Sequence, residues 1–113
     1  MRVNDVEQLK ERFGLRNSSR FICYSDAGVP WRAPEGVLVS GYVDEGKLLL
    51  IILNESKNTQ ADVVLDTAAL SRFGVKNFAF SDAETGKTVP FSGGKSTITL
   101  QPHDYKMLWN LAK

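Results

Sequence analysis

The chain has 113 residues, of which 42% are hydrophobic, and this size and composition fit one soluble globular domain with a single core. Its 14 basic and 13 acidic side chains give a net charge of +1, which argues against a nucleic-acid partner. One cysteine excludes an internal disulfide. The N-terminus lacks the apolar stretch of a signal peptide, and no apolar run is long enough to span a membrane. We therefore expect neither a nucleic-acid nor a membrane partner, and the compartment stays open.

The first segment of the chain predicts a short amphipathic helix over residues 4–13. Three apolar residues recur there at helical spacing: Val6, Leu9 and Phe13. Gly14 then suits the left-handed position just past a helix end. A helix this short is marginal alone, so its apolar stripe must pack on this domain or on a neighbour. We assign residues 1–15 to this helix, which could link a preceding domain.

Residues 16–113 predict a second unit built from β-strands, with its clearest hairpin at Val37–Val43 and Lys47–Asn54. The intervening Asp44–Gly46 has the length and chemistry of a tight turn, with glycine at the position of positive φ. The second arm contains six consecutive apolar residues, Leu48–Leu53, so both of its faces must be covered. One face is the core, and the other is covered by the helix or by a partner domain.

Further short strands are expected on both sides of this hairpin. Their expected ranges are Arg20–Tyr24, Ala61–Asp66, Lys76–Ser81, Thr88–Phe91, Thr97–Leu100 and a last strand from Tyr105 to Leu111. Asp26–Gly36 is expected to be a loop, and Thr67–Phe73 a short helix that begins after Asp66 and ends at Gly74. Seven or eight short strands with turn residues between them predict an all-β antiparallel sandwich rather than an α/β fold.

Two residues are expected in the core because of their apolar surroundings. Trp109 lies on an alternating strand, and we expect it to be buried. Its expected neighbours are Leu50, Ile52, Phe78 and Leu100. Cys23 lies in the apolar segment Phe21–Tyr24, which predicts a buried thiol rather than a reactive one.

The sequence offers little for catalysis or metal binding. One cysteine and one histidine cannot supply a zinc site. Asp82, Glu84 and Thr85 have a loosely suitable spacing for calcium, but an aspartate that caps a turn is the favoured interpretation. His103 is expected on a surface turn, and no Gly-x-Ser-x-Gly nucleophile motif is present. We therefore expect no catalytic residue, no metal site and no cofactor.

Two aromatic residues are candidates for stacking on a sugar ring. Trp31 lies in a loop rich in proline and glycine, and Tyr24 lies shortly before this loop. An exposed indole in such a loop would indicate a binding site. The alternative is that Trp31 folds down and caps the sandwich. The sequence leaves both interpretations open.

Several segments resemble, in order, the C-terminal β-sandwich domain that follows the catalytic barrel in many glycoside hydrolases. They are Val39–Tyr42 leading into Gly46–Asn54, then Ala61–Asp66, Phe73–Val75, the turn Ser81–Gly86 with its Asp-x-x-Thr-Gly pattern, and the closing Ile98–Trp109. Each segment alone is common in sandwiches, but their order matches over most of the chain.

This resemblance implies an accessory role. In such enzymes the catalytic carboxylates lie on the barrel, and the terminal sandwich packs against the barrel and supports it. The resemblance therefore implies a non-catalytic module of a carbohydrate-active enzyme, whose partner is a catalytic barrel domain or, for a free-standing domain, a second copy of the chain. Some related modules bind sugar, so a carbohydrate-binding module is the alternative.

Overall fold

The structure is a computed structural model and describes residues 20–110, which form an all-β antiparallel sandwich, as predicted. The expected helix over 4–13, the assigned segment 1–15 and Leu111 lie outside the described residues. The strands are β1 (Arg20–Ile22), β2 (Trp31–Arg32), β3 (Val37–Asp44), β4 (Lys47–Asn54), β5 (Gln60–Leu65), β6 (Phe80–Asp82), β7 (Thr88–Val89), β8 (Lys95–Thr99) and β9 (Tyr105–Trp109). One described helix, α2 (Thr67–Arg72), follows β5.

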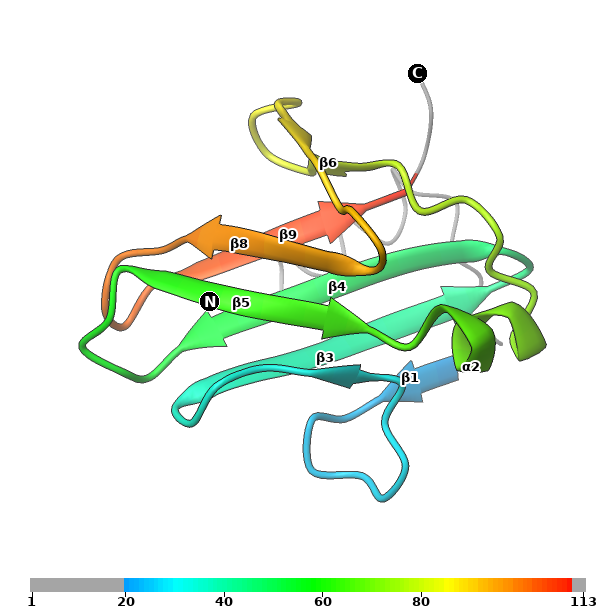
Figure 1. Cartoon of the computed structure of the whole chain (residues 1–113), viewed down its shortest axis with the longest axis horizontal. Helices are drawn as coiled ribbons and strands as arrows, with labels where there is room; N and C mark the ends of the chain where they lie inside the picture. Colours follow the sequence, from blue (N-terminus) through cyan, green and yellow to red (C-terminus); the bar gives the residue numbers. More distant parts are fainter. Residues whose placement is uncertain (1–19, 111–113) are drawn as a thin grey trace.

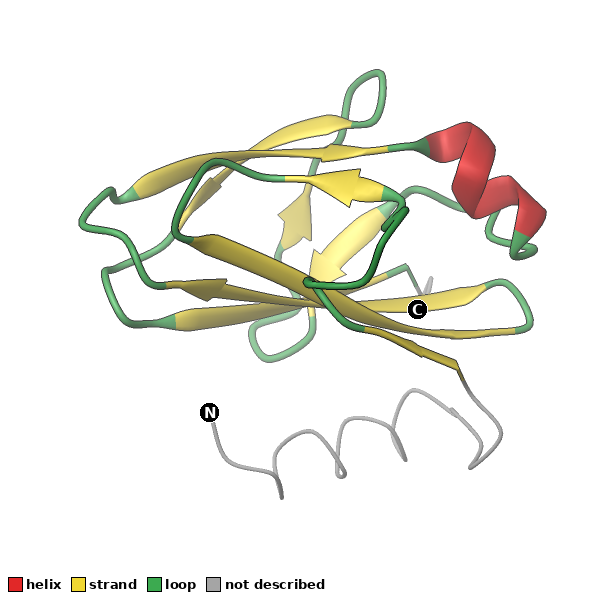
Figure 2. Cartoon of the chain, turned by 90° about the horizontal axis from the view of Figure 1, so that it is seen from below, coloured by secondary structure: helices red, strands yellow, loops and turns green. Residues whose placement is uncertain are grey.

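Two sheets of unequal size form the two layers of the sandwich. The large sheet has six strands in the order β1-β3-β4-β9-β6-β7, and the small sheet has three in the order β2-β5-β8. In Figure 1, β5 and β8 cross in front of β3, β4 and β9. Figure 2, turned by 90°, shows the two layers one above the other, with α2 at one end. The small sheet therefore covers only one face of the large sheet.

The β3–β4 hairpin forms where the turn residues predict it. Asp44 pairs with Lys47, so the connection is the two residues Glu45 and Gly46. Both have positive φ, 48° and 86°, which matches the right-handed twist of the two flanking strands. The register then places Leu48 opposite Val43 and sets which side chains of β4 point to each face.

Both faces of β4 are buried, as its uninterrupted apolar sequence predicts. Leu48, Leu50 and Ile52 point into the sandwich and belong to the main core together with side chains of the small sheet. Leu49 and Ile51 point the other way. They belong to a second cluster on the outer face of the large sheet, here called the outer cluster: Leu49, Ile51, Ala83, Met107 and Trp109.

Trp109 is buried, as expected, but its predicted neighbours are wrong. It is only 6% exposed. It pairs with Leu49 across β4 and β9, so it shares the outer face, whereas Leu108 pairs with Leu50 and points into the main core. Alternation along a strand shows which residues share a face, but it does not show which face is the inner one.

The short helix after β5 closes one end of the sandwich. Its N-terminus begins after Asp66, whose carboxylate accepts a hydrogen bond from the Ala69 amide at 3.0 Å. It ends at Arg72; Gly74 just beyond it has φ of 87°, and the amide of Val75 donates back to the Leu70 carbonyl at 3.0 Å. Leu70 and Val75 are fully buried in the main core, so this predicted helix is confirmed and anchored.

Several strand boundaries differ from the prediction, and three differences stand out. The first strand ends at Ile22, because the carboxylate of Asp26 accepts a hydrogen bond from the Cys23 amide and turns the chain. The strand expected from Lys76 begins only at Phe80. Inside the expected loop, Trp31 and Arg32 pair with β5 as the short strand β2. In the last two cases contacts with distant segments override the local sequence pattern.

Candidate functional site

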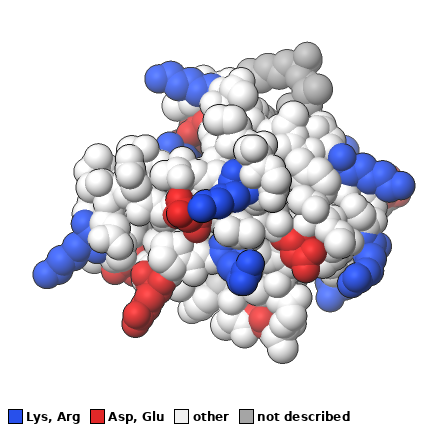
Figure 3. Space-filling view, in the orientation of Figure 1, with Lys and Arg blue, Asp and Glu red and all other residues white. Residues whose placement is uncertain are grey.

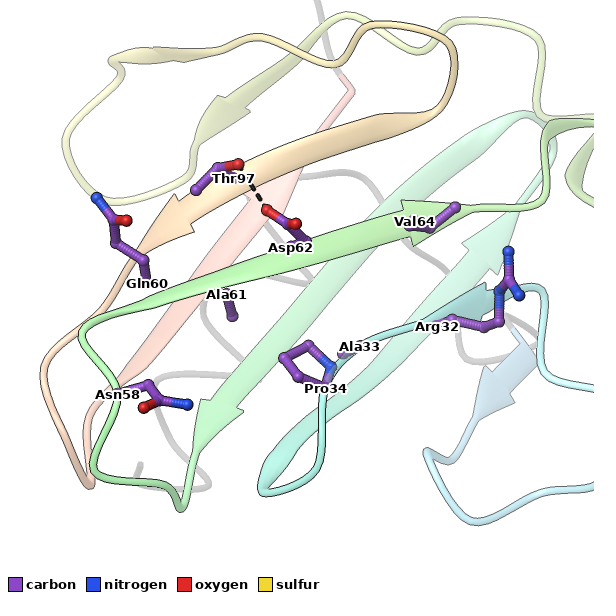
Figure 4. Close-up of a pocket in the computed structure, with 9 residues that line it drawn as sticks. All are labelled: Arg32, Ala33, Pro34, Asn58, Gln60, Ala61, Asp62, Val64 and Thr97. Atoms are coloured by element: carbon purple, nitrogen blue, oxygen red, sulfur yellow. Dashed lines mark hydrogen bonds between the residues drawn. The ribbon is translucent and has the colours of Figure 1, made fainter.

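A hollow lies on the outer side of the small sheet, and Figure 4 shows the side chains around it. Its volume is about 540 Å³. Its lining residues are Arg32, Ala33, Pro34, Asn58, Gln60, Ala61, Asp62, Val64 and Thr97. They come from all three strands of this sheet and from the segments after β2 and before β5. The alternation of β5 explains this arrangement, because Ala61, Val63 and Leu65 point inward and the residues between them point outward.

Asp62 is the centre of a small charged network in this hollow. The Thr97 hydroxyl donates to its carboxylate at 2.6 Å, and the Lys95 ammonium lies 3.5 Å from its other oxygen. The hydrogen bond from Thr97, and secondarily the positive charge of Lys95, lower the pKa of Asp62 below the usual value of a carboxyl group. Asp62 is thus held ionised and already paired.

The hollow is lined by both polar and apolar side chains, such as Arg32 and Asp62 on the one hand and Pro34 and Val64 on the other. Glycosidic hydrolysis by the usual route needs two carboxyl groups on opposite sides of the bond, and Asp62 is the one acidic residue among those that line this hollow. Figure 3, in the orientation of Figure 1, shows acidic and basic side chains interspersed over this side of the molecule. The hollow therefore offers hydrogen-bonding groups but no carboxylate pair.

The two residues predicted to stack on sugar lie beside a second hollow of about 400 Å³. Tyr24 is 49% exposed. Trp31 is 3% exposed, and its indole Nε1 donates to the carbonyl of Val39 on the large sheet at 2.6 Å. Stacking needs an accessible ring face, so in this arrangement it would fall to Tyr24. Sugar binding by either residue stays a prediction.

The outer face of the large sheet carries a row of large apolar and aromatic side chains. Phe21 pairs with Tyr42, Tyr42 with Leu49 and Leu49 with Trp109, so four large side chains form one row across β1, β3, β4 and β9. The rings of Phe21 and Tyr42 lie 4.8 Å apart. At the edge of the sheet Phe21 is 47% exposed. The sequence predicted that this face is covered, but not that the row ends in an exposed aromatic.

The remaining candidate residues occupy turns. Asp82 accepts hydrogen bonds from the amides of Glu84 and Thr85 at 2.8 and 3.0 Å, which is the predicted turn cap. His103 is on the surface, as expected, with its ring 3.3 Å from Glu55. Among residues 20–110, no group of three or more His, Cys, Asp or Glu side chains is arranged to hold a metal ion.

The prediction of a buried thiol at Cys23 is wrong. Because β1 ends at Ile22, just before this residue, Cys23 is only partly buried, and its sulfur lies 3.4 Å from the Ser25 hydroxyl. Hydrogen bonding with Ser25 lowers the pKa of the Cys23 thiol below its usual value.

Sequence reasoning missed two buried asparagines that bind backbone at the ends of the large sheet. The amide of Asn110 donates to the carbonyls of Gly46 and Asn77 at 3.0 and 2.9 Å, and its oxygen accepts from the Leu48 amide at 2.9 Å. Asn54 donates to two carbonyls at the other end of the sheet.

No helix within the described range is long and apolar enough to cross a membrane.

Comparisons with known proteins give matches among solved structures only. No protein-family model and no curated protein matches the sequence. The structure of Gan42B, a GH42 β-galactosidase, matches with a TM-score of 0.47 and 16% identity over 96% of this chain. A catalytic mutant of Gan42B from G. stearothermophilus matches with a TM-score of 0.46 and 16% identity over 95% of this chain. The chain covers 12% of the length of each of these two proteins.

Proposed function

We propose that this β-sandwich is a non-catalytic accessory module of a glycoside hydrolase, which packs against a catalytic domain and supports it. The observation that carries the proposal is the edge of the large sheet at Phe21, which is 47% exposed and continues the apolar row of the outer face. An antiparallel sheet with one face toward solvent normally alternates apolar and polar residues. Here Leu49, Ile51 and Met107 are apolar on the outer face as well. In this proposal, apolar side chains on this face pack against another protein surface rather than face water.

The sequence resemblance supports the same role from a different direction. The order of hairpin, helical turn, Asp-x-x-Thr-Gly turn and closing hairpin is similar to that of sandwiches that follow a catalytic barrel. In this proposal the carboxylates that cleave the glycosidic bond belong to the partner domain. This module contributes an apolar surface.

The contact with the catalytic domain is proposed at the β1 edge of the large sheet. Phe21 and Tyr24 are the large apolar side chains that stay about half exposed. Phe21 continues the row of Tyr42 and Leu49, so the exposed edge is joined directly to the packed part of the same face. Aromatic residues of this kind dominate the binding energy of many interfaces.

Mixing experiments test this proposal. The chain would be combined with a separately produced glycoside hydrolase barrel from the same organism, without that enzyme's own terminal sandwich. We expect a 1:1 complex in sedimentation velocity and a higher melting temperature of the barrel. Phe21→Ser should weaken the complex, and Thr97→Ala, on the opposite sheet, should leave it unchanged. Failure of every such barrel to bind would contradict the proposal.

A carbohydrate-binding module is the second candidate, because Tyr24 is exposed beside a hollow. A titration of the chain with oligosaccharides, followed by amide NMR, separates the two functions. Signal shifts confined to residues 23–29, and lost in Tyr24→Ala, would favour sugar binding. Under the packing proposal these signals stay in place.

A further inference from the structure

The small sheet lacks a strand beside the first half of β5. β2 has two residues, and the second of them, Arg32, pairs with Val64 of β5. If β2 continued in this register, Pro34 would stand opposite Asp62. Proline has no N–H group to donate to a neighbouring strand. The carbonyl of Pro34 accepts instead from the amide of Val37 at 3.0 Å, so the chain turns away toward β3 and leaves one side of β5 open.

The open side of β5 presents unpaired main-chain groups. In an antiparallel sheet, alternate residues of a strand direct their N–H and C=O groups to the same neighbour. Just after β5, the amide of Asp66 donates to the carbonyl of Pro30, next to β2, at 2.8 Å. Gln60 and Asp62 lie at the same alternation, so their main-chain groups point to this side as well. Among residues 20–110, none pairs with them there, and such groups bond water or a ligand.

Side chains with unused hydrogen-bonding groups surround this gap. In Figure 4, Arg32 lies at one end of the hollow, near the end of β5, and Asn58 and Gln60 lie at the other, near its start. Within the described range, the side chains of these three residues have no hydrogen-bond or ion-pair partner. Asp62 lies between them and is held by Thr97 at 2.6 Å. Four residues of an antiparallel strand span about 14 Å, so these polar groups line an elongated hollow.

The mixture of donors and acceptors selects the class of ligand. The guanidinium of Arg32 only donates hydrogen bonds, the carboxylate of Asp62 only accepts them, and the amides of Asn58 and Gln60 do both. An anionic ligand would meet the negative charge of Asp62, and a cationic ligand would meet Arg32. A hydroxyl group donates and accepts through one oxygen, so a neutral ligand with several hydroxyl groups satisfies all of these side chains.

The apolar part of the hollow and its size fit the same class. Ala33, Pro34 and Val64 also line it, and they offer a surface to the C–H groups of a sugar ring. Its volume of about 540 Å³ lies within the range of about 300–1,000 Å³ that is usual for small ligands. An extended peptide is the competing occupant. Only Gln60 and Asp62 offer it free main-chain groups, whereas strands usually run for about 3–10 residues.

We propose that this hollow, here called the small-sheet hollow, binds a neutral oligosaccharide. Asp62 accepts hydrogen bonds from sugar hydroxyl groups, Arg32 donates to them, and Pro34 packs against the C–H face of a ring. Thr97 holds the Asp62 carboxylate in place. The site lies on the opposite sheet from Phe21, so it stands independently of the proposed docking to a catalytic domain.

Amide NMR on the full chain tests the site, with maltohexaose, cellohexaose, xylohexaose and galactotetraose as probes. We expect at least one of these sugars to shift the signals of Arg32, Gln60 and Asp62 until they saturate, and to leave residues 23–29 in place. Absence of saturable shifts with every probe would overturn the proposal. Shifts confined to residues 23–29 would also overturn it and would place the sugar at Tyr24 instead.

A set of variants on the small sheet measures the contribution of each group. Arg32→Met removes the donor but keeps the apolar stem, and Asp62→Asn removes the charge but keeps the size. We expect each to weaken sugar binding about tenfold or more, because hydrogen bonds to charged groups are the strong ones. Thr99→Ala, exposed on β8 but outside the hollow, is the control and should leave the affinity unchanged. Equal affinities of all three variants, each shown to be folded by thermal unfolding, would contradict the proposal.

An acidic probe tests the class of ligand. Hexagalacturonate should bind more weakly than the neutral sugars, and Asp62→Asn should reduce this difference because it removes the like charge. Tighter binding of hexagalacturonate than of every neutral sugar would overturn the assignment to a neutral ligand. Phe21→Ser should leave sugar affinity unchanged while it weakens the complex with a barrel, so the failure of one proposal is distinguishable from the failure of the other.

Discussion

The indole of Trp31 occupies the space that a side chain on Gly41 would need. A β-carbon on Gly41 would stand 2.8 Å from Cη2 of Trp31 and 3.2 Å from the carbonyl oxygen of Leu49. Trp31 belongs to the small sheet and Gly41 to the large one. The two residues therefore set how closely the layers approach at this point.

Gly41→Ala should lower the stability of the sandwich. The added methyl group would clash with a buried ring and with backbone, and overpacking of this kind costs about 1–3 kcal/mol. Urea denaturation would measure the change in the free energy of unfolding. Thr99→Ala, at an exposed position of β8, is the control and should change it much less. Equal effects of the two substitutions would contradict the close contact.

Trp31→Phe should also destabilise the chain, for a different reason. It keeps an aromatic ring in the core but removes the Nε1–H group that bonds the Val39 carbonyl at 2.6 Å. A buried acceptor that loses its partner costs about 1–3 kcal/mol. Thermal unfolding provides the measurement. A variant of unchanged stability that loses affinity for sugar would instead assign Trp31 to a binding site.

Asn110→Ala should be among the most damaging polar substitutions. Asn110 is buried, and its side chain bonds the Leu48 amide and the carbonyls of Gly46 and Asn77. Loss of all three bonds leaves buried groups unpaired, and we expect a cost of at least about 2 kcal/mol. Chemical denaturation would measure this loss in the free energy of unfolding. Asn58 is exposed, so Asn58→Ala should change the free energy of unfolding little. Equal losses for Asn58→Ala and Asn110→Ala would refute the structural role of Asn110.

The pH dependence of Asp62 follows from its partners. Its pKa is lowered in the folded state, so its interactions stabilise the fold above the unfolded pKa and are lost as the pH falls through the folded pKa. Thr97→Val removes the largest cause and should raise the pKa of Asp62. Lys95→Met should raise it less. Carboxyl-carbon NMR titrations would measure both shifts, and the reverse order would contradict the geometry.

Local chemistry explains which parts of the fold the sequence predicted. The β3–β4 hairpin and the helix ends depend on residues that are neighbours in sequence, such as Glu45, Gly46 and Asp66. The two-residue strand β2 does not depend on such neighbours. Trp31 pairs with Leu65, far along the chain, and its own surroundings are rich in proline and glycine. No local pattern contains that pairing.

The candidate surfaces were less predictable, because they depend on which face points outward. Trp109 belongs to a strand with apolar residues at consecutive positions, so alternation alone fits either face. Asn110 bonds Leu48, which is 62 residues away. Cys23 lies in an apolar segment, yet the strand ends at Ile22 rather than at the expected Tyr24 and leaves it partly exposed. In each case the deciding contact is distant or the decisive boundary shifts by two residues.

Trp109→Ala tests whether the outer face of the large sheet is a packed layer. Removing a buried tryptophan costs about 3–5 kcal/mol, because transfer energy is lost and a cavity remains. With a urea dependence of about 1–3 kcal/mol per molar, the midpoint should fall by about 1–5 M. A midpoint that barely moves would show that Trp109 is a surface residue and would make it a candidate platform for a ligand.

The protein concentration in the same experiment identifies the cover of this face. When this face is covered within a single chain, the unfolding midpoint of the unmodified chain is independent of concentration. When a second copy covers it, the midpoint rises with concentration, because association stabilises the folded state by mass action. Trp109→Ala would then abolish this dependence together with the dimer. We expect the first result, a concentration-independent midpoint that Trp109→Ala lowers equally at every concentration.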